Sequence, residues 1–149
     1  MLRKDFTVSA RDVCDAKLMG ADCVLLIAAA LADAELAEFH DLARELGLDA
    51  LVEVHDEAEL ARVLGCCQPS IIGVNQRDLV SFEVDTARAV RVAPTIPAGV
   101  VRVAESGITG VADAEVLAAA GYDALLVGET LVRSGQPAET VRSLRVLRT

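Results

Sequence analysis

Residues 45–55 read ELGLDALVEVH, and this stretch contains the unit that the chain repeats. A helix-type segment ends at Gly47, which suits the left-handed position just beyond a helix, and a short apolar run begins soon afterwards. Residues 18–28 (LMGADCVLLIA) and 119–129 (AAGYDALLVGE) follow the same plan. The apolar runs have the length expected of strands that are buried on both faces, so the repeat predicts strands of a parallel sheet.

Amphipathic helical segments separate these strands, and two further strands are expected at 71–75 and 100–106. Strict alternation of strands and helices with short connections indicates right-handed βα units and a parallel sheet. Helices are expected within residues 9–20, 33–47, 56–65, 86–92, 110–121 and 138–148.

Two α/β architectures fit this order: an open doubly wound sheet, and part of a (β/α)8 barrel. A dinucleotide-binding doubly wound fold carries GxGxxG after its first strand, but here the run LLI at 25–27 is followed by alanines. Barrel strands end in polar residues that point into a common mouth, and such residues are present. We therefore predict one domain over residues 1–149, an incomplete TIM barrel of about five parallel strands with flanking helices.

Composition argues against several partners and cofactors. The net charge is -9 and the pI is near 4.6, so the surface should repel nucleic acid and anionic membranes. No apolar run approaches the roughly 20 residues of a membrane span. The four cysteines form no CxxC pair and the two histidines lie at no ligand spacing to them, so no metal is expected. Cys66 and Cys67 are expected as small buried residues in a reducing cytoplasm.

Polar residues interrupt or end the predicted strands. Glu53 lies between valines, and a carboxylate in a buried strand is costly unless it is paired or belongs to a site. We favour an acid–base role over a structural ion pair. Asn75 at the end of the strand at 71–75 and Arg77 just after it suit a site that binds a polar ligand. Asp78 suits a turn, in which its carboxylate accepts hydrogen bonds from the following backbone N–H groups.

Two late strands end in small residues, namely Glu105-Ser106-Gly107 and Gly128-Glu129. Glycine-rich loops after consecutive strands bind phosphate through backbone N–H groups in many (β/α)8 barrels. Ser106 could otherwise cap a helix, and Gly128 could serve packing alone.

Seven phrases of the chain, in this order and at these spacings, resemble the indole-3-glycerol-phosphate synthase family. They are LRKDF, GADCVLLIAA, ALVEVH, IIGVNQRDL, FEVD, VAESGI and ALLVGE. The resemblance implies a (β/α)8 barrel that converts 1-(2-carboxyphenylamino)-1-deoxyribulose 5-phosphate into indole-3-glycerol phosphate, CO2 and water. It also implies that no cofactor or metal takes part.

The resemblance also assigns site residues. Catalytic roles are implied for Lys4, Glu53, Asn75 and Glu105, with Lys4 as the general acid of ring closure. Contacts with the substrate are implied for Arg77 and Ser106. A phosphate site is implied at Ser106, Gly107, Gly128 and Glu129, where Glu129 would serve through its backbone N–H with its carboxylate turned away.

In the family, RKDF lies at the end of the third barrel strand, so we expect the amino-terminal strands, with a further catalytic lysine and glutamate, to be missing here. The chain alone should then be inactive or weakly active. Its open sheet edges should favour self-association or pairing with the missing segment. The alternative is a non-catalytic phosphate-binding half-barrel or interaction module.

Overall fold

A computed structural model describes residues 1–78 and 81–146 and contains one six-stranded sheet. The strands lie side by side in chain order, and each neighbouring pair is parallel. They are β1 (Leu2–Arg3), β2 (Cys23–Ile27), β3 (Asp49–Val54), β4 (Ile71–Asn75), β5 (Val101–Glu105) and β6 (Ala124–Leu126). The predicted partial barrel is confirmed, with the two-residue β1 added to the five longer strands.

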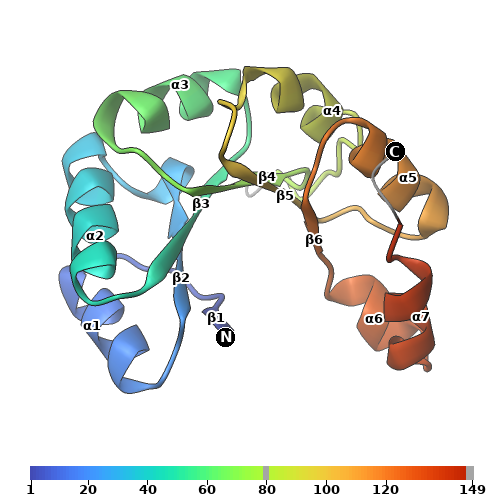
Figure 1. The fold of residues 1–149 in the computed structure, drawn as a ribbon, viewed down its shortest axis with the longest axis horizontal. Coiled ribbons are helices and arrows are strands. Elements are labelled where there is room, and N and C mark those ends of the chain that lie inside the picture. Colours follow the sequence, from blue (N-terminus) through green and yellow to red (C-terminus); the bar gives the residue numbers. More distant parts are fainter. Residues whose placement is uncertain (79–80, 147–149) are drawn as a thin grey trace.

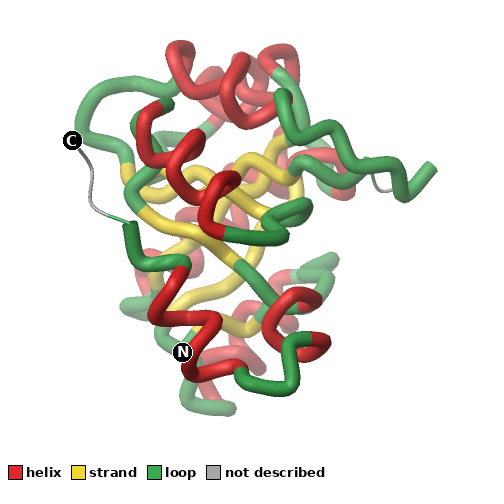
Figure 2. Tube along the Cα trace, turned by 90° about the vertical axis from the view of Figure 1, so that its right-hand side faces the viewer, coloured by secondary structure: helices red, strands yellow, loops and turns green. Residues whose placement is uncertain are grey.

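The helices cover the outer side of the curved sheet. Figure 1 shows α1 to α5 arranged along the outside of the arc, with α6 and α7 together beyond β6. Figure 2 shows the strands lying inside this layer of helices. The helices are α1 (Ala10–Leu18), α2 (Asp33–Glu45), α3 (Glu57–Cys66), α4 (Arg88–Val92), α5 (Val111–Ala119), α6 (Glu129–Arg133) and α7 (Pro137–Ser143), with 3-10 turns η1 (Ala28–Ala30) and η2 (Ala93–Thr95).

The repeated unit folds as its glycines predict. Gly20, Gly47 and Gly121 have φ angles of 80°, 66° and 96°, so each turns the chain out of a helix and into the next strand. At the other helix ends, Ser9 and Asp56 act as N-caps, each accepting a hydrogen bond from a backbone N–H of the first turn.

Alternation along the strands separates two faces of the sheet. The outer face packs on the helices and carries the larger apolar core, which includes Leu26, Val52 and Ile72. The inner face carries a smaller apolar cluster of Leu25, Ile27, Leu51 and Val103. The buried polar side chains of this inner face, Glu53, Asn75 and Glu105, lie where the strands approach their carboxyl ends, whereas Asp49 at the amino end of β3 is exposed.

The carboxyl-terminal part differs from the prediction. The helix expected at 138–148 is present as the shorter α7, an additional helix α6 precedes it, and residues 147 and 148 lie outside the described residues. Gly135, with a φ angle of 67°, separates the two helices, and Pro137 occupies the first turn of α7. Glu129, expected in a loop, is the first residue of α6.

The adjacent cysteines are less buried than the sequence predicts. All four cysteines are free, and Cys66 and Cys67 are half-buried at the end of α3, not fully buried as predicted. Burial is the main cause that raises the pKa of the Cys67 thiol to about 12.

Within residues 1–78 and 81–146, no group of three or more His, Cys, Asp or Glu side chains is placed to hold a metal ion. None of the helices described there is both long and apolar enough to cross a membrane.

Candidate active site

Lys4 follows β1, and its ammonium group lies between two buried carboxylates. Its Nζ is 3.4 Å from Glu53 Oε2 and 3.4 Å from Glu105 Oε2. Both glutamate side chains are 1% exposed, whereas the lysine side chain is 44% exposed. Burying a carboxylate is unfavourable without a cation, so Lys4 compensates the charge on the pair and also connects it to solvent.

Asn75 at the end of β4 holds Glu53 from the other side. Its Nδ2 donates a hydrogen bond of 3.0 Å to Glu53 Oε1, and its Oδ1 accepts one of 3.0 Å from the backbone N–H of Arg77. Both ends of the amide are therefore engaged, which fixes its orientation. The β4–β5 register pairs Asn75 with Glu105, so the polar side chains gather at one end of the sheet.

The pKa of Glu105 is raised to about 8, chiefly by burial and then by the negative charge of Glu53, although Lys4 opposes the shift. At neutral pH the Glu105 carboxyl is therefore mostly protonated. Two carboxyl groups that face one ammonium thus provide both an acid and an acceptor, an arrangement suited to acid–base chemistry.

Gly73 in the middle of β4 makes room for Glu105. A Cβ atom at this position would lie 1.9 Å from Glu105 Oε1 and 3.1 Å from Leu51 Cδ1. The glycine thus lets the Glu105 side chain lie across the inner face of the sheet and reach Lys4.

The loop after β5 contains two consecutive residues in the left-handed region. Ser106 and Gly107 have φ angles of 64° and 68°, a conformation that is unfavourable for serine. Gln76, which is 2% exposed, donates a hydrogen bond of 2.8 Å from Nε2 to the carbonyl of Ser106 and so helps to hold this turn. A Cβ at Gly107 would lie 2.5 Å from Val84 Cγ1, so only glycine fits there without a shift.

Arg77 and Glu129 connect the loop after β4 to the start of α6. Arg77 Nη2 lies 2.9 Å from Glu129 Oε2, and Arg133 Nη2 lies 3.2 Å from Glu129 Oε1. The Glu129 carboxylate is therefore paired with two guanidinium groups. This pairing reduces the repulsion that an unpaired carboxylate would exert on a bound phosphate.

A pocket of about 1220 Å³ joins most of the predicted site residues. Lys4, Glu105 and Arg77 line it together with both glycine-containing loops, including Ser106, Gly107 and Gly128, and with Glu129 at the start of α6. Glu53 and Asn75 do not line it, but they lie behind Lys4 through the contacts given above. The ammonium group and the two loops therefore open on the same side of the molecule.

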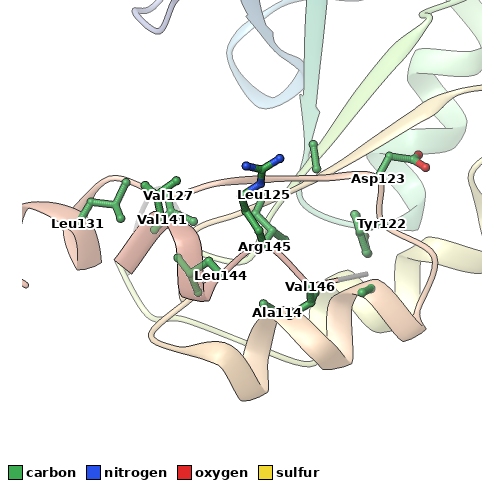
Figure 3. Close-up of a pocket in the computed structure, with 12 residues that line it drawn as sticks. Ala114, Tyr122, Asp123, Leu125, Val127, Leu131, Val141, Leu144, Arg145 and Val146 are labelled. Carbon is green, nitrogen blue, oxygen red and sulfur yellow. The ribbon is translucent and has the colours of Figure 1, made fainter. Parts of the chain in front are cut away.

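A second pocket, of about 400 Å³, lies on the outer side of β6 (Figure 3). Its lining is mostly apolar and comes from α5, β6 and the α7 region, including Leu125, Val141 and Leu144. Asp123 and Arg145 are the charged residues that line it. It lacks the paired acid and base of the inner pocket, so the inner pocket is the candidate active site.

Sequence reasoning missed the contacts that Gly73, Gln76 and the His55–Glu59 pair make beside the site. A glycine inside an apolar strand is a signal of close approach and could have indicated Gly73. The position of His55 on the Glu53 face was visible in the alternation of β3, but its contact with Glu59 was not.

The fold and the site together define the class: a partial (β/α)8 barrel whose polar pocket opens at the carboxyl ends of its strands. Residues 1–144 match the family model described as indole-3-glycerol phosphate synthase. The chain belongs to this family.

Curated relatives support the assignment. Indole-3-glycerol phosphate synthases from Mycobacteroides abscessus and Micrococcus luteus are 49% and 50% identical to this chain, and each alignment covers 97% of it. The alignments cover 53% and 54% of those relatives, so the chain spans about half the length of the curated relatives it matches.

Solved structures show the same fold at low sequence identity. The BexX/CysO complex of Amycolatopsis orientalis contains a chain that matches with a TM-score of 0.64 at 21% identity, over 92% of this chain and 57% of that one. The YdjI aldolase of Escherichia coli K12 matches with a TM-score of 0.64 at 19% identity, over 95% of this chain and 60% of the aldolase. These likenesses concern the fold alone.

Proposed function

We propose that this chain supplies the active-site portion described above to an indole-3-glycerol-phosphate synthase, a carbon–carbon lyase. Its substrate would be the phosphosugar 1-(2-carboxyphenylamino)-1-deoxyribulose 5-phosphate. A bond forms between the aromatic ring and the ribulose carbonyl carbon, the ring carboxylate leaves as CO2, and the former carbonyl oxygen leaves as water. The family membership and the contact of Lys4, which lines the pocket, with two carboxyl groups support this reaction.

The proposed acid–base roles follow the charge pattern of the site. Lys4 donates a proton to the carbonyl oxygen as it becomes a hydroxyl, because an ammonium group is suited to developing negative charge. Glu53 and Glu105 assist the proton transfers that remove this hydroxyl. Asn75 positions Glu53 through the 3.0 Å hydrogen bond described above.

The proposed phosphate site is the mouth of the same pocket. Ser106, Gly107, Gly128 and Glu129 would offer backbone N–H groups, and Ser106 would also contact the substrate. Arg77 would supply a positive charge beside the phosphate, as its place in the pocket lining permits.

One observation carries the proposal: the Lys4 ammonium, which lines a pocket together with both loops, lies 3.4 Å from two buried carboxyl groups. The test measures indole-3-glycerol phosphate formation by the 149-residue chain, alone and combined with the part of the Micrococcus luteus relative that it does not match. We expect little or no product from the chain alone and clear turnover from the combination.

A Lys4→Ala variant is the control, and it should abolish turnover in the combination while phosphate binding remains. Absence of product from a folded combination would contradict the proposed activity. A rate from the chain alone that equals that of the intact relative would contradict the expected weak activity, but not the reaction.

We also propose that the sheet edges at β1 and β6 take part in self-association or in pairing with the remaining part of such an enzyme. β1 has two residues and covers only the first part of β2, so among the described residues no strand lies on that side of the backbone groups farther along β2. Sedimentation analysis of the chain would detect self-association, and a strictly monomeric chain at high concentration would contradict it.

A cytoplasmic location is proposed with this pathway, and the four free cysteines agree with a reducing compartment.

A further inference from the structure

We propose that His55, which is buried, and Glu59, whose side chain is partly exposed, form a pair that keeps Glu53 ionised, so that the proton shared by the two active-site carboxyl groups resides on Glu105. His55 would then be a positioning residue that acts through Glu53. The relevance of this pair to catalysis rests on the proposed function, whereas its charge state can be tested without turnover.

The ring of His55 is held from one side by α3. Its Nδ1 lies 3.1 Å from Glu59 Oε2, and its backbone N–H donates a hydrogen bond of 2.8 Å to the same oxygen. Its other ring nitrogen, Nε2, lies 3.7 Å from Glu53 Oε1. The histidine side chain is 11% exposed, so water has little access to the contact between the ring and Glu53.

The protonation state follows from this arrangement. In a neutral ring that donates from Nδ1 to Glu59, Nε2 would present a lone pair to the Glu53 carboxylate. Buried Nε2 has no hydrogen-bond partner within the described part of the chain. A proton on Nε2 converts two facing acceptors into an attractive contact and places an imidazolium between two carboxylates.

Three charged groups act on the ring from the elements packed around it. Glu59 of α3 and Glu53 of β3 favour the charged form, and Arg88 of α4 opposes it. The pKa of His55 is raised, first because of its hydrogen bond to Glu59, so the two carboxylates prevail over both Arg88 and burial.

The two active-site carboxyl groups consequently have unequal surroundings. Glu53 contacts Lys4, the Asn75 amide and the His55 ring, whereas Glu105 has Lys4 alone as a close cation among the described residues. The better-supported carboxylate keeps its negative charge and the other keeps the proton. His55 thus decides which carboxyl group is the acceptor and which is the acid.

The experiment follows histidine ring nitrogens and glutamate side-chain carbons by NMR during pH titration of the 149-residue chain. His55→Asn can retain a donor to Glu59 but removes the ring charge, and Glu59→Gln retains an acceptor but removes the carboxylate. Glu57→Gln is the matched control, because it removes a charge from an exposed position of the same helix. A His40→Gln variant assigns the two histidine signals.

We expect a doubly protonated His55 ring at pH 7 in the parent chain. His55→Asn should move the shared proton from Glu105 towards Glu53 in the carboxyl titration, and Glu59→Gln should lower the titration midpoint of His55 by about one unit. Glu57→Gln should change neither. A neutral ring at pH 7, or unchanged midpoints in the folded variants, would overturn the proposal. If His55→Asn does not fold, the Glu59→Gln titration decides alone, and neither result depends on lyase activity.

Discussion

Replacing Gly73 by alanine should destabilise the protein, because the inner face of the sheet has no room for a methyl group there. The new Cβ would lie 1.9 Å from Glu105 Oε1, so the carboxyl group would have to retreat by roughly 1 Å or more to reach an ordinary contact. Leu51 Cδ1, at 3.1 Å, restricts the other side. Retreat would also weaken the 3.4 Å contact between Glu105 and Lys4.

Overpacking of this kind costs about 1–3 kcal/mol. With a urea dependence of about 2 kcal/mol per molar, the unfolding midpoint should fall by roughly 0.5–1.5 M. Gly65→Ala is the matched control, since Gly65 lies in α3 and a Cβ there meets nothing within 4 Å. That control should be neutral or stabilising by up to about 1 kcal/mol, because alanine is the better helix former.

A double-mutant cycle identifies the cause. If Glu105 is responsible for the clash, most of the cost of Gly73→Ala should disappear in a Glu105→Ala background. Urea unfolding of the four proteins, followed by circular dichroism, measures this coupling. Equal stability of Gly73→Ala and Gly65→Ala would refute the packing argument, and an unchanged cost in the Glu105→Ala background would refute the role of the carboxyl group.

Three further outcomes are expected. The pKa of Glu105 rises from 4.5 to about 8 on folding, so between these pH values the folded protein binds more protons than the unfolded chain. The free energy of unfolding should therefore decline as pH rises through this range. Urea titrations at several pH values should show this decline, and Glu105→Gln should flatten it. Gly107→Ala should destabilise the protein more than Gly99→Ala, because both glycines have positive φ but, of the two, Gly107 is crowded. Gly107→Ala should also weaken phosphate binding, which calorimetry measures. Tyr122→Phe removes the 2.7 Å hydrogen bond to the buried Ala89 carbonyl and should cost about 1–2 kcal/mol in thermal unfolding.

Much of the fold and part of the site could be predicted because local sequence determines them. The glycine that ends each helix and the apolar run that follows it identify the βα units, and a carboxylate within such a run identifies Glu53 as a residue in need of a partner. Parallel strands have their carboxyl ends at one edge of the sheet, so a parallel sheet also predicts that Lys4 lies near the loops after β5 and β6.

Other features depend on geometry that the sequence does not display. The contact of His55 with Glu59 requires the first turn of α3 to lie against the end of β3, and the need for Gly73 depends on the side-chain direction of Glu105 on the neighbouring strand. Helix α6 was missed because five residues after Gly128 are too few to show a periodic apolar stripe.

The order of the strands has a consequence for how the chain acquires its structure. Paired positions in adjacent strands are separated by only 20 to 30 residues along the chain, and each ladder joins consecutive strands. Each ladder can therefore form as soon as one intervening helical segment has been synthesised, without waiting for a distant partner. During translation the sheet can grow in one direction, and Lys4 can meet Glu105 only after four helix-containing connections lie between them and the fifth strand has joined.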